Sequence, residues 1–215
     1  MNKIDPISST NTLAKWRLME LTLVLIGVAT FHASPAWALT QCGVGCPASY
    51  YSTATRTNLS CASRIETVCS PVSGTSLNTC EDHCPSGYYA TATGTNYSCG
   101  TPYGNLQTTC KQISGTSLNT CEDRCPSGYY ATATGSKSSC GTPYGNRQTS
   151  CTLVSGTSLN TCEDRCPSGY YATATGYNSS CGTPYGNLQT SCTLVSGTSL
   201  NTCEDRCPAG YYPTG

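Results

Sequence analysis

Cysteine is the residue type in this chain whose number and spacing point most directly to chemistry. The 215 residues include 18 cysteines, and most of these follow the pattern C-x3-C-x14-C-x10-C. Cysteines at this density form disulfides in an oxidising compartment or coordinate zinc in a reducing one. Because the count is even and an export signal precedes the cysteines, we expect disulfides and no metal or other cofactor. The residues assigned to disulfides are Cys42, Cys46, Cys61, Cys69, Cys80, Cys84, Cys99, Cys110, Cys121, Cys125, Cys140, Cys151, Cys162, Cys166, Cys181, Cys192, Cys203 and Cys207.

Catalytic chemistry has few candidates. Downstream of the leader the only histidine is His83, and arginine takes its place in the later repeats. No nucleophile, base and orienting acid recur together, so we expect no enzymatic activity. The only recurring acids are adjacent pairs such as Glu81-Asp82. Such a pair could contribute to a Ca²⁺ site, but this ion takes six or more oxygens, so we interpret the acids as capping a turn beside a cation.

Residues 1–38 have the layout of a signal peptide. Three cationic residues precede an apolar stretch from Leu21 to Phe31, and Ala36-Trp37-Ala38 supplies a small-x-small cleavage sequence. The apolar stretch is short for a membrane span, so we expect cleavage after Ala38. An uncleaved leader is then the only expected attachment to a membrane. The expected destination is an oxidising space, with the protein secreted, at the cell surface or periplasmic.

Composition excludes two broad classes of function. Past residue 38 the chain has only 17 leucine, isoleucine and valine residues, too few to stabilise a large enzyme domain by hydrophobic burial alone. The same part carries eight lysines and arginines against nine aspartates and glutamates. Without a basic surface to neutralise phosphates, nucleic-acid binding is not expected.

Tandem repetition organises the rest of the chain. Cys80, Cys121, Cys162 and Cys203 are spaced 41 residues apart. A fixed period of this length is the signature of an array of structural repeats, each in contact with its neighbours. The expected organisation is a signal peptide at 1–38, a divergent first repeat at 39–72, full repeats at 73–113, 114–154 and 155–195, and a partial repeat at 196–215.

Within each repeat the sequence predicts short β-structure between turns. The segment Tyr-Tyr-Ala-Thr-Ala-Thr at 88–93 is typical of a short strand, which Gly94 is expected to end. Residues 101–105 predict a turn. Residues 77–85 could form one helical turn with both of its cysteines on the same side. The expected fold class is small and disulfide-rich β, an elongated tandem array of disulfide-stapled hairpin repeats with little hydrophobic core.

One motif resembles a known kind of extracellular module. Cys84-Pro85-Ser86-Gly87-Tyr88-Tyr89 returns in nearly the same form at Cys125, Cys166 and Cys207. Together with a cysteine some 14 residues downstream, it is similar to the cysteine-rich modules of growth-factor, tumour-necrosis-factor and ephrin receptors. The C-x3-C start and the x10 gaps depart from the usual spacing of those modules. The resemblance implies an elongated extracellular spacer or protein-binding surface and specifies no ligand.

The receptor resemblance also implies a disulfide pairing, which joins the second and third cysteines of a repeat and the fourth to the first of the next. The pairs are Cys46–Cys61, Cys84–Cys99, Cys125–Cys140 and Cys166–Cys181, then Cys69–Cys80, Cys110–Cys121, Cys151–Cys162 and Cys192–Cys203. This scheme leaves Cys42 and Cys207 over. The alternative joins first to third and second to fourth within a repeat and leaves Cys203 and Cys207 over. Four cysteines allow three connectivities, so both schemes stay open.

The candidate partner-binding surface is the short window before the third cysteine of each repeat. The repeats are otherwise almost identical, and a window that accepts asparagine, lysine, tyrosine or serine is expected to be solvated. Tyrosines close in sequence are expected to flank it; packing over the disulfides is the favoured role of the tyrosine pairs, and a stacking platform for sugars or a partner's side chains is the alternative. The expected partner-binding residues are Tyr88, Tyr89, Tyr103, Asn96, Lys137 and Asn178.

Three classes of function remain. The first is an exported cell-surface or secreted repeat protein, a structural stalk or adhesive module that binds an unknown extracellular protein or glycan. The second is a lectin-like carbohydrate binder, and the third is a secreted inhibitor or toxin-like effector. Near-identical tandem repeats favour the first class, because repetition supplies length and avidity.

Overall fold

The structure is a computed structural model that describes residues 38–211, and regular secondary structure there consists of β-strands. The expected signal peptide lies outside the described residues, apart from Ala38. Within the described range, no helix has the length and apolar character needed to cross a membrane. The strands are β1 (Leu39–Cys42), β2 (Tyr50–Thr57), β3 (Ile65–Pro71), β4 (Ser76–Thr79), β5 (Tyr88–Thr95), β6 (Leu106–Gln112), β7 (Ser117–Thr120), β8 (Tyr129–Ser136), β9 (Arg147–Leu153), β10 (Ser158–Thr161), β11 (Tyr170–Tyr177) and β12 (Leu188–Leu194).

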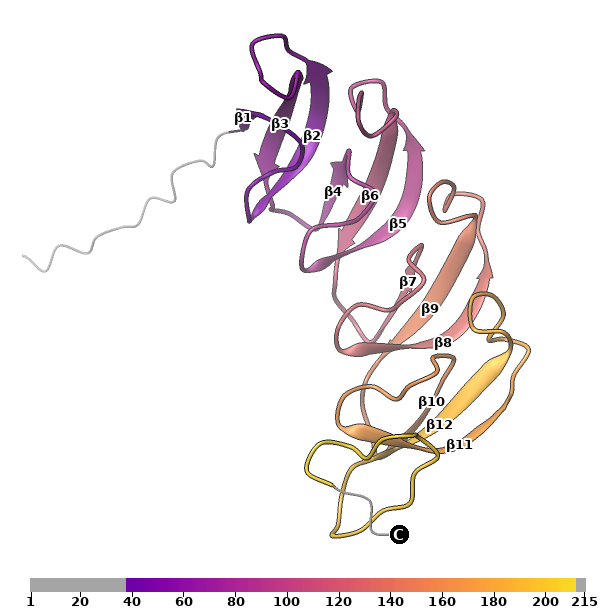
Figure 1. Cartoon of the computed structure of the whole chain (residues 1–215). Helices are drawn as coiled ribbons and strands as arrows, with labels where there is room; N and C mark the ends of the chain where they lie inside the picture. Colours follow the sequence, from indigo (N-terminus) through magenta and orange to yellow (C-terminus); the bar gives the residue numbers. More distant parts are fainter. Residues whose placement is uncertain (1–37, 212–215) are drawn as a thin grey trace, which may run out of the picture. The chain divides into compact units, whose positions relative to one another are not determined.

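The strands form three-stranded antiparallel sheets, one within each of the repeats 39–72, 73–113, 114–154 and 155–195. In every sheet the last strand in sequence is central, as in the order β4-β6-β5. Figure 1 shows the sheets following one another in sequence order. The expected fold class, a tandem array of small disulfide-stapled β units, is confirmed. The central strand β6 and its counterparts were not expected from the sequence.

The long strand of each repeat carries a bulge. β5 forms where aromatic and β-branched residues predict a strand, and it includes Gly94 rather than ending there. The pairing of β5 with β6 is interrupted at Thr91, whose hydroxyl donates to the Thr109 carbonyl at 3.2 Å. The same irregularity occurs in the other sheets. Because a bulge bends and twists its strand, the far half of β5 turns toward the next repeat.

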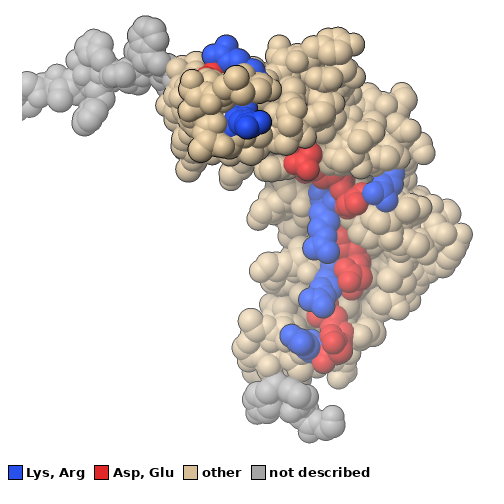
Figure 2. Space-filling view, turned by 45° about the horizontal axis from the view of Figure 1, so that its top comes forward, with Lys and Arg blue, Asp and Glu red and all other residues tan. Residues whose placement is uncertain are grey.

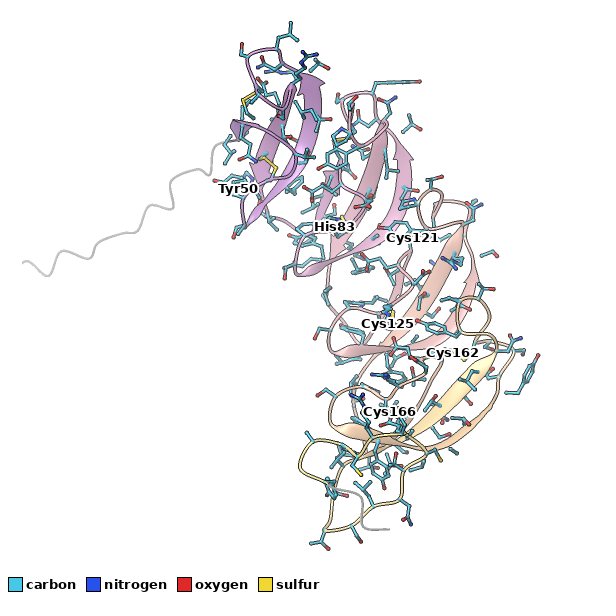
Figure 3. All side chains as sticks on the ribbon, viewed as in Figure 1. Tyr50, His83, Cys121, Cys125, Cys162 and Cys166 are labelled. Carbon is cyan, nitrogen blue, oxygen red and sulfur yellow. A yellow bond between two sulfur atoms is a disulfide. The ribbon has the colours of Figure 1, made fainter. Side chains whose placement is uncertain are left out.

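Each full repeat closes on itself through two disulfides, visible as yellow bonds in Figure 3. The first cysteine pairs with the third and the second with the fourth, so the alternative scheme is confirmed. The disulfides are Cys42–Cys61, Cys46–Cys69, Cys80–Cys99, Cys84–Cys110, Cys121–Cys140, Cys125–Cys151, Cys162–Cys181 and Cys166–Cys192. Eight disulfides in the described residues fit an exported protein of an oxidising environment.

The pairing implied by the receptor resemblance is wrong. β4 and β5 lie on opposite edges of β6, so the segment between them has to cross β6. This crossing carries Cys84 to Cys110, with 5.7 Å between their Cα atoms. The assignment of Cys203 and Cys207 to disulfides is also wrong, since both are free. The pairs that do not form are Cys46–Cys61, Cys84–Cys99, Cys125–Cys140, Cys166–Cys181, Cys69–Cys80, Cys110–Cys121, Cys151–Cys162 and Cys192–Cys203.

The helical turn expected at residues 77–85 is wrong as well. Its start belongs to β4, and residues 80–83 form a bend. The Thr79 hydroxyl does accept the Glu81 N–H at 3.2 Å, as a helix cap would. The same hydroxyl donates to the Ser52 carbonyl of the preceding repeat at 3.1 Å. Strand pairing and contact with the neighbouring repeat therefore override the local tendency to form a turn of helix.

The core lies between consecutive sheets and contains few aliphatic side chains. One cluster packs Tyr89 of one repeat against Leu118, Tyr129 and Cys151 of the next. Apart from the disulfide-bonded cysteines, threonines are the most numerous fully buried side chains. Five of their hydroxyls donate to main-chain carbonyls, whereas the Thr108 hydroxyl has no partner. The fully buried threonines are Thr67, Thr79, Thr108, Thr120, Thr149, Thr161 and Thr190.

Candidate binding face at the repeat junctions

In the described residues, consecutive repeats pack and hydrogen-bond to one another along the continuous chain, and every disulfide lies within a repeat. At the junction between repeats 73–113 and 114–154, the Cys121 N–H donates to the Ala90 carbonyl at 2.8 Å. The Thr93 N–H donates to the Ser139 carbonyl at 2.7 Å. The same two bonds recur one repeat later, each at 2.8 Å. The outer edge of each long strand is thus covered by the following repeat, which fixes the register of one repeat on the next.

A tyrosine from each later repeat reaches back across the junction. The Tyr185 hydroxyl donates to the Asp123 carbonyl, and the Tyr144 hydroxyl donates to the Asp82 carbonyl in the same way. Burial raises the pKa of Tyr185 to about 12, with a further contribution from the nearby Glu163 carboxylate. The hydroxyl therefore stays protonated and able to donate near neutral pH. Burial raises the pKa of Tyr144 in the same way.

Charged side chains gather on one face of the array. Figure 2 shows lysines and arginines in a row beside a parallel row of aspartates and glutamates. Each repeat from residue 114 onward contributes one exposed arginine next to an exposed aspartate and a half-buried glutamate, as in Arg165, Asp164 and Glu163. His83 takes the place of the arginine in repeat 73–113. We call these two rows the charged face. Its exposed members are the cations Arg124, Arg165 and Arg206 and the acids Asp82, Asp123, Asp164 and Asp205.

The arginines of the charged face have no partner carboxylate at ion-pair distance. The ion pairs in the described residues join Arg56 to Glu66, His83 to Glu81 and Asp82, and Arg147 to Asp123. Arg124, Arg165 and Arg206 form none of them. An unpaired guanidinium keeps its planar set of N–H donors free for carboxylate, phosphate or sulfate groups of a ligand.

A groove lies on the charged face between repeats 114–154 and 155–195. It has a volume of about 610 Å³ and is lined by Arg124 from one repeat and Glu163, Arg165 and Tyr185 from the other. An adjoining hollow of about 410 Å³ shares Arg124 and Tyr185. We call the two together the junction groove. Its walls offer both arginines and carboxylates. It therefore suits a ligand that carries acceptor groups for the arginines and donor groups for the carboxylates.

Glu163 is the half-buried acid of the junction groove. Burial raises the pKa of its carboxyl, whereas Arg124 and hydrogen bonding from the Cys125 backbone lower it and Asp164 adds to the rise. Burial dominates, so the net shift is upward. At the earlier junctions, burial is also the main reason why the pKa values of the Glu81 and Glu122 carboxyls are raised. Every junction therefore buries part of an acid whose charged form is disfavoured.

A second exposed feature lies at the loop tips, which we define as residues 58–60, 96–98, 137–139 and 178–180 with the strand residue before each. Tyr97 is 86% exposed, Tyr177 79% and Leu59 82%. These are the most exposed large apolar side chains in the described residues. They vary from repeat to repeat, since serine stands at the positions that match Tyr97 and Tyr177 in repeat 114–154. The tips therefore do not present one uniform apolar surface.

The expected binding window is largely exposed, as its variability suggested. Tyr97 is 86% exposed and Tyr177 79%, whereas Asn96, Lys137 and Asn178 are half-buried. The Asn96 side-chain oxygen accepts the Ser98 N–H at 3.0 Å, and the Lys137 ammonium donates to the Thr91 carbonyl of the preceding repeat at 3.3 Å. These two side chains therefore also stabilise the tip and the junction. Contact of the window with a partner stays a prediction.

The tyrosines expected to flank the window are separated from one another. Tyr89 is 6% exposed and packs into the next repeat, so its assignment as a partner-contacting residue is wrong. Tyr88 is half-buried and its hydroxyl donates to the Gly74 carbonyl. It begins β5 while the window follows the end of that strand, a separation of about 25 Å for eight residues of strand. Tyr103 is half-buried at a junction, where burial raises its pKa.

Sequence reasoning missed the arginines as candidate binding residues. Arginine at the position of His83 indicated only an exposed polar site. The missed signal is the regular recurrence of Glu-Asp-Arg just before the second cysteine, which stacks like charges into rows once the repeats are joined. The described residues hold no group of three or more histidine, cysteine, aspartate or glutamate side chains placed to bind a metal ion. Protein-family models, curated proteins and solved structures yield no match to this chain.

Proposed function

We propose that this protein is an exported, disulfide-stapled repeat protein that acts at the cell surface, or after secretion, as a stalk and adhesive module. The charged face is its binding surface. The observation that carries the proposal is the recurrence of an unpaired arginine beside an exposed aspartate and a half-buried glutamate in each later repeat. This combination recurs once per repeat period, as a multivalent binder requires.

Weak sites in a fixed array can bind tightly together. The junction groove between repeats 114–154 and 155–195 is open and lined by charged and polar side chains, so a single such site is expected to bind weakly. Linking several copies raises the effective concentration of the later sites and can increase apparent affinity by about 10²–10⁴-fold without any new contact. The hydrogen-bonded junctions support this proposal, because they hold successive sites at one spacing. A partner with a repeated anionic or zwitterionic group, such as a surface glycan or a clustered protein, suits that spacing.

The resemblance to receptor cysteine-rich modules supports the same role at the level of architecture. Those modules serve as extracellular spacers and protein-binding surfaces. The disulfide pairing here differs from the pairing that the resemblance implied. The proposal therefore takes only the extracellular spacer role from it and derives the binding surface from the charged face.

The loop tips favour one alternative, carbohydrate binding through exposed aromatic rings. Tyr97 and Tyr177 project with most of their surface in solvent, as a stacking platform for a sugar would. Two variants separate the alternatives. Tyr97→Ser with Tyr177→Ser installs the serine found at the matching positions of repeat 114–154 and should abolish binding only if the tips carry it. Arg124→Ser with Arg165→Ser should abolish binding if the charged face carries it.

The main test is a truncation series that starts at Leu39 and ends at residue 154 or 195, so that the chains carry one and two of the charged-face arginines; a chain that ends at residue 113 carries none and is the baseline. Each chain ends after a complete pair of disulfides and keeps the preceding neighbour of every repeat. Binding to a glycan array and to candidate cells should strengthen about 100-fold or more from the chain that ends at residue 154 to the chain that ends at residue 195. The control is Arg147→Leu, because leucine occupies this position in the two neighbouring repeats. Equal apparent affinity across the series would remove the multivalent role.

A further inference from the structure

The acids of this protein are concentrated on the charged face. Past residue 38, every aspartate and glutamate except Glu66 belongs to one of four Glu-Asp pairs, and an arginine or a histidine follows each aspartate. The same part of the chain has a net charge of −1, from eight lysines and arginines against nine aspartates and glutamates. Two copies of the protein can therefore approach each other without long-range repulsion.

Much of this charge is held in place and has no partner within its own chain. Among the described residues, Arg124, Arg165 and Asp164 form no ion pair, and all three side chains are exposed. Asp164 and Arg165 lie between two disulfide-bonded cysteines, Cys162 and Cys166, which fix the backbone that carries them. Charges on a fixed backbone lose less freedom when they pair with a second molecule. The charged face is therefore prepared for a partner of complementary charge.

The charged face is complementary to itself under one rotation. Figure 2 shows its cation row and its acid row running parallel along the array. A half-turn about an axis along the array, in the plane of contact, brings the cation row of each copy opposite the acid row of the other. A half-turn about an axis across the array, in the same plane, brings like charges together instead. Charge therefore selects a pair of copies that lie parallel to each other.

A second copy also has the matching spacing. The arginines of successive repeats, such as Arg124 and Arg165, are 41 residues apart, and so are the aspartates that precede them. The same junction hydrogen bonds hold these repeats in one register. In a parallel pair without a shift, each arginine meets the aspartate of the same repeat in the other copy, and the twofold axis makes every such contact occur twice. An unrelated partner would need the same period to use all of these charges.

We propose that the partner of the charged face is a second copy of this chain, bound in a parallel, twofold-symmetric pair. The proposal rests on the proposed function, because it takes the charged face as the binding surface and names what binds there. The arginine of each repeat pairs with the aspartate of the same repeat in the other copy, as Arg165 does with Asp164. Asp123 takes part while it keeps its ion pair with Arg147 of its own chain at 3.0 Å. The pair is a double stalk whose two chains run in the same direction.

Salt distinguishes this pairing from association through the loop tips. Exposed ion pairs are individually weak, so the two copies should bind reversibly. Raising sodium chloride from about 0.05 M to about 1 M shortens the range of charge interactions to about 3 Å and should weaken dimerisation about tenfold or more. Association through the exposed apolar side chains of the tips, Leu59 and Tyr97, would not weaken in this way.

The test is sedimentation equilibrium of the full exported chain at low salt, with free thiols alkylated so that no disulfide can join two copies. The natural chain should approach twice its monomer mass as its concentration rises. Arg124→Asp with Arg165→Asp makes both rows acidic, and Asp123→Arg with Asp164→Arg makes both rows cationic. Each variant alone should dimerise at least about tenfold more weakly than the natural chain, because like charges then face each other. An equimolar mixture of the two variants should dimerise again, which also shows that both are folded.

The matched control is Arg64→Asp with Lys111→Asp, which makes the same change in net charge outside the charged face and should dimerise like the natural chain. A natural chain that stays monomeric at about 1 mM would overturn the pairing, as would a mixture of the two variants that stays monomeric. If the natural chain is monomeric but the truncation series still binds glycans or cells more tightly as arginines are added, the second copy is excluded and the proposed function stands. Dimerisation without binding to glycans or cells would support the pairing and count against an adhesive role.

Discussion

The junctions and the loop tips are made from the same repeat, yet they tolerate change very differently. At the junctions, residues such as Thr120 and Cys121 are buried and bonded to the preceding repeat. At the tips, Tyr97 and Tyr177 stand in solvent where another repeat has serine. A junction residue has to fit the preceding repeat, whereas a tip residue has solvent as its surroundings, so we expect substitutions at the junctions to cost far more stability. The cation of the charged face is intermediate, since it is His83 in one repeat and arginine in the later ones.

Removal of a disulfide should have the largest effect on stability. Cys125→Ser with Cys151→Ser opens a link that spans 26 residues of sequence. Loss of the link should lower the free energy of unfolding by about 3 kcal/mol in the chain-entropy account. Urea denaturation of the repeat array measures this change. Cys203→Ser should leave the midpoint unchanged because Cys203 is free, and an equal loss in both variants would contradict the pairing.

Removal of a buried hydroxyl at a junction should have the second-largest effect on stability. The Thr120 hydroxyl donates to the Ala90 carbonyl and accepts the Glu122 N–H, both at 3.1 Å. Thr120→Val removes both bonds and leaves the Glu122 N–H without this acceptor, whereas the Ala90 carbonyl keeps its bond from the Cys121 N–H. The substitution should lower the free energy of unfolding by about 1.5 kcal/mol. Thr202→Val is the matched control, because Thr202 makes the same bonds in a more exposed setting. A smaller loss for Thr120 than for Thr202 would contradict the described burial.

Removal of one tyrosine hydroxyl should lower the free energy of unfolding when the tyrosine lies at a junction and leave it unchanged when the tyrosine lies at a loop tip. Tyr185→Phe removes the bond to the Asp123 carbonyl and should lower the free energy of unfolding by about 1 kcal/mol. Tyr177→Phe removes a hydroxyl from a side chain that is 79% exposed and should change nothing measurable. Denaturation curves of the two variants, recorded together, provide the comparison. Equal effects would mean that Tyr185 does not brace the junction.

The junction acids should make stability depend on pH. Burial raises the folded pKa of Glu163 above its ordinary value of 4.5, so folding favours the protonated form. The stability this provides is fully present below the ordinary value and is lost as the pH rises through the folded pKa. Glu163→Gln should therefore be more stable than the natural chain at neutral pH and show a flatter pH profile. Asp164→Asn, at the exposed neighbouring position, is the control, and an unchanged profile for Glu163→Gln would contradict the burial.

Substitutions at the tips should have the smallest effect on stability. Tyr97→Ser should alter the free energy of unfolding by less than about 0.5 kcal/mol, because the side chain is 86% exposed. Thermal unfolding checks this. A larger loss of stability would mean that Tyr97 makes a contact that the structure does not show. The loop tips would then tolerate substitution no better than the junctions.

The sequence predicted the repeat period, the long strand and the turn at residues 101–105, because each has a local signature in its residue types. It did not predict β6, since Leu-Gln-Thr-Thr-Cys-Lys-Gln buries threonine and cysteine where an apolar strand pattern was sought. The two disulfide schemes could not be distinguished from the sequence, and the scheme implied by the receptor resemblance is wrong, because the pairing depends on which strand is central. That property belongs to the sheet and not to cysteine spacing.

The candidate site was predicted least well. Variability between repeats indicated solvent exposure, yet the Lys137 ammonium donates across a junction to the Thr91 carbonyl. Proximity in sequence suggested that Tyr88 flanks the window, yet the two lie at opposite ends of β5. The charged face arises only from the stacking of repeats, so no single repeat reveals it.

The central claim is that each repeat is covalently closed and that the junctions between sheets are not covalent. Mass mapping of disulfide-linked peptides from the protein, digested without reduction, tests this most directly. The structure predicts peptides that join Cys80 to Cys99 and Cys84 to Cys110, with Cys203 and Cys207 recovered as thiols. A peptide that joins Cys110 to Cys121 would contradict it, because that disulfide would link consecutive repeats, and a peptide that joins Cys84 to Cys99 would contradict the pairing within the repeat.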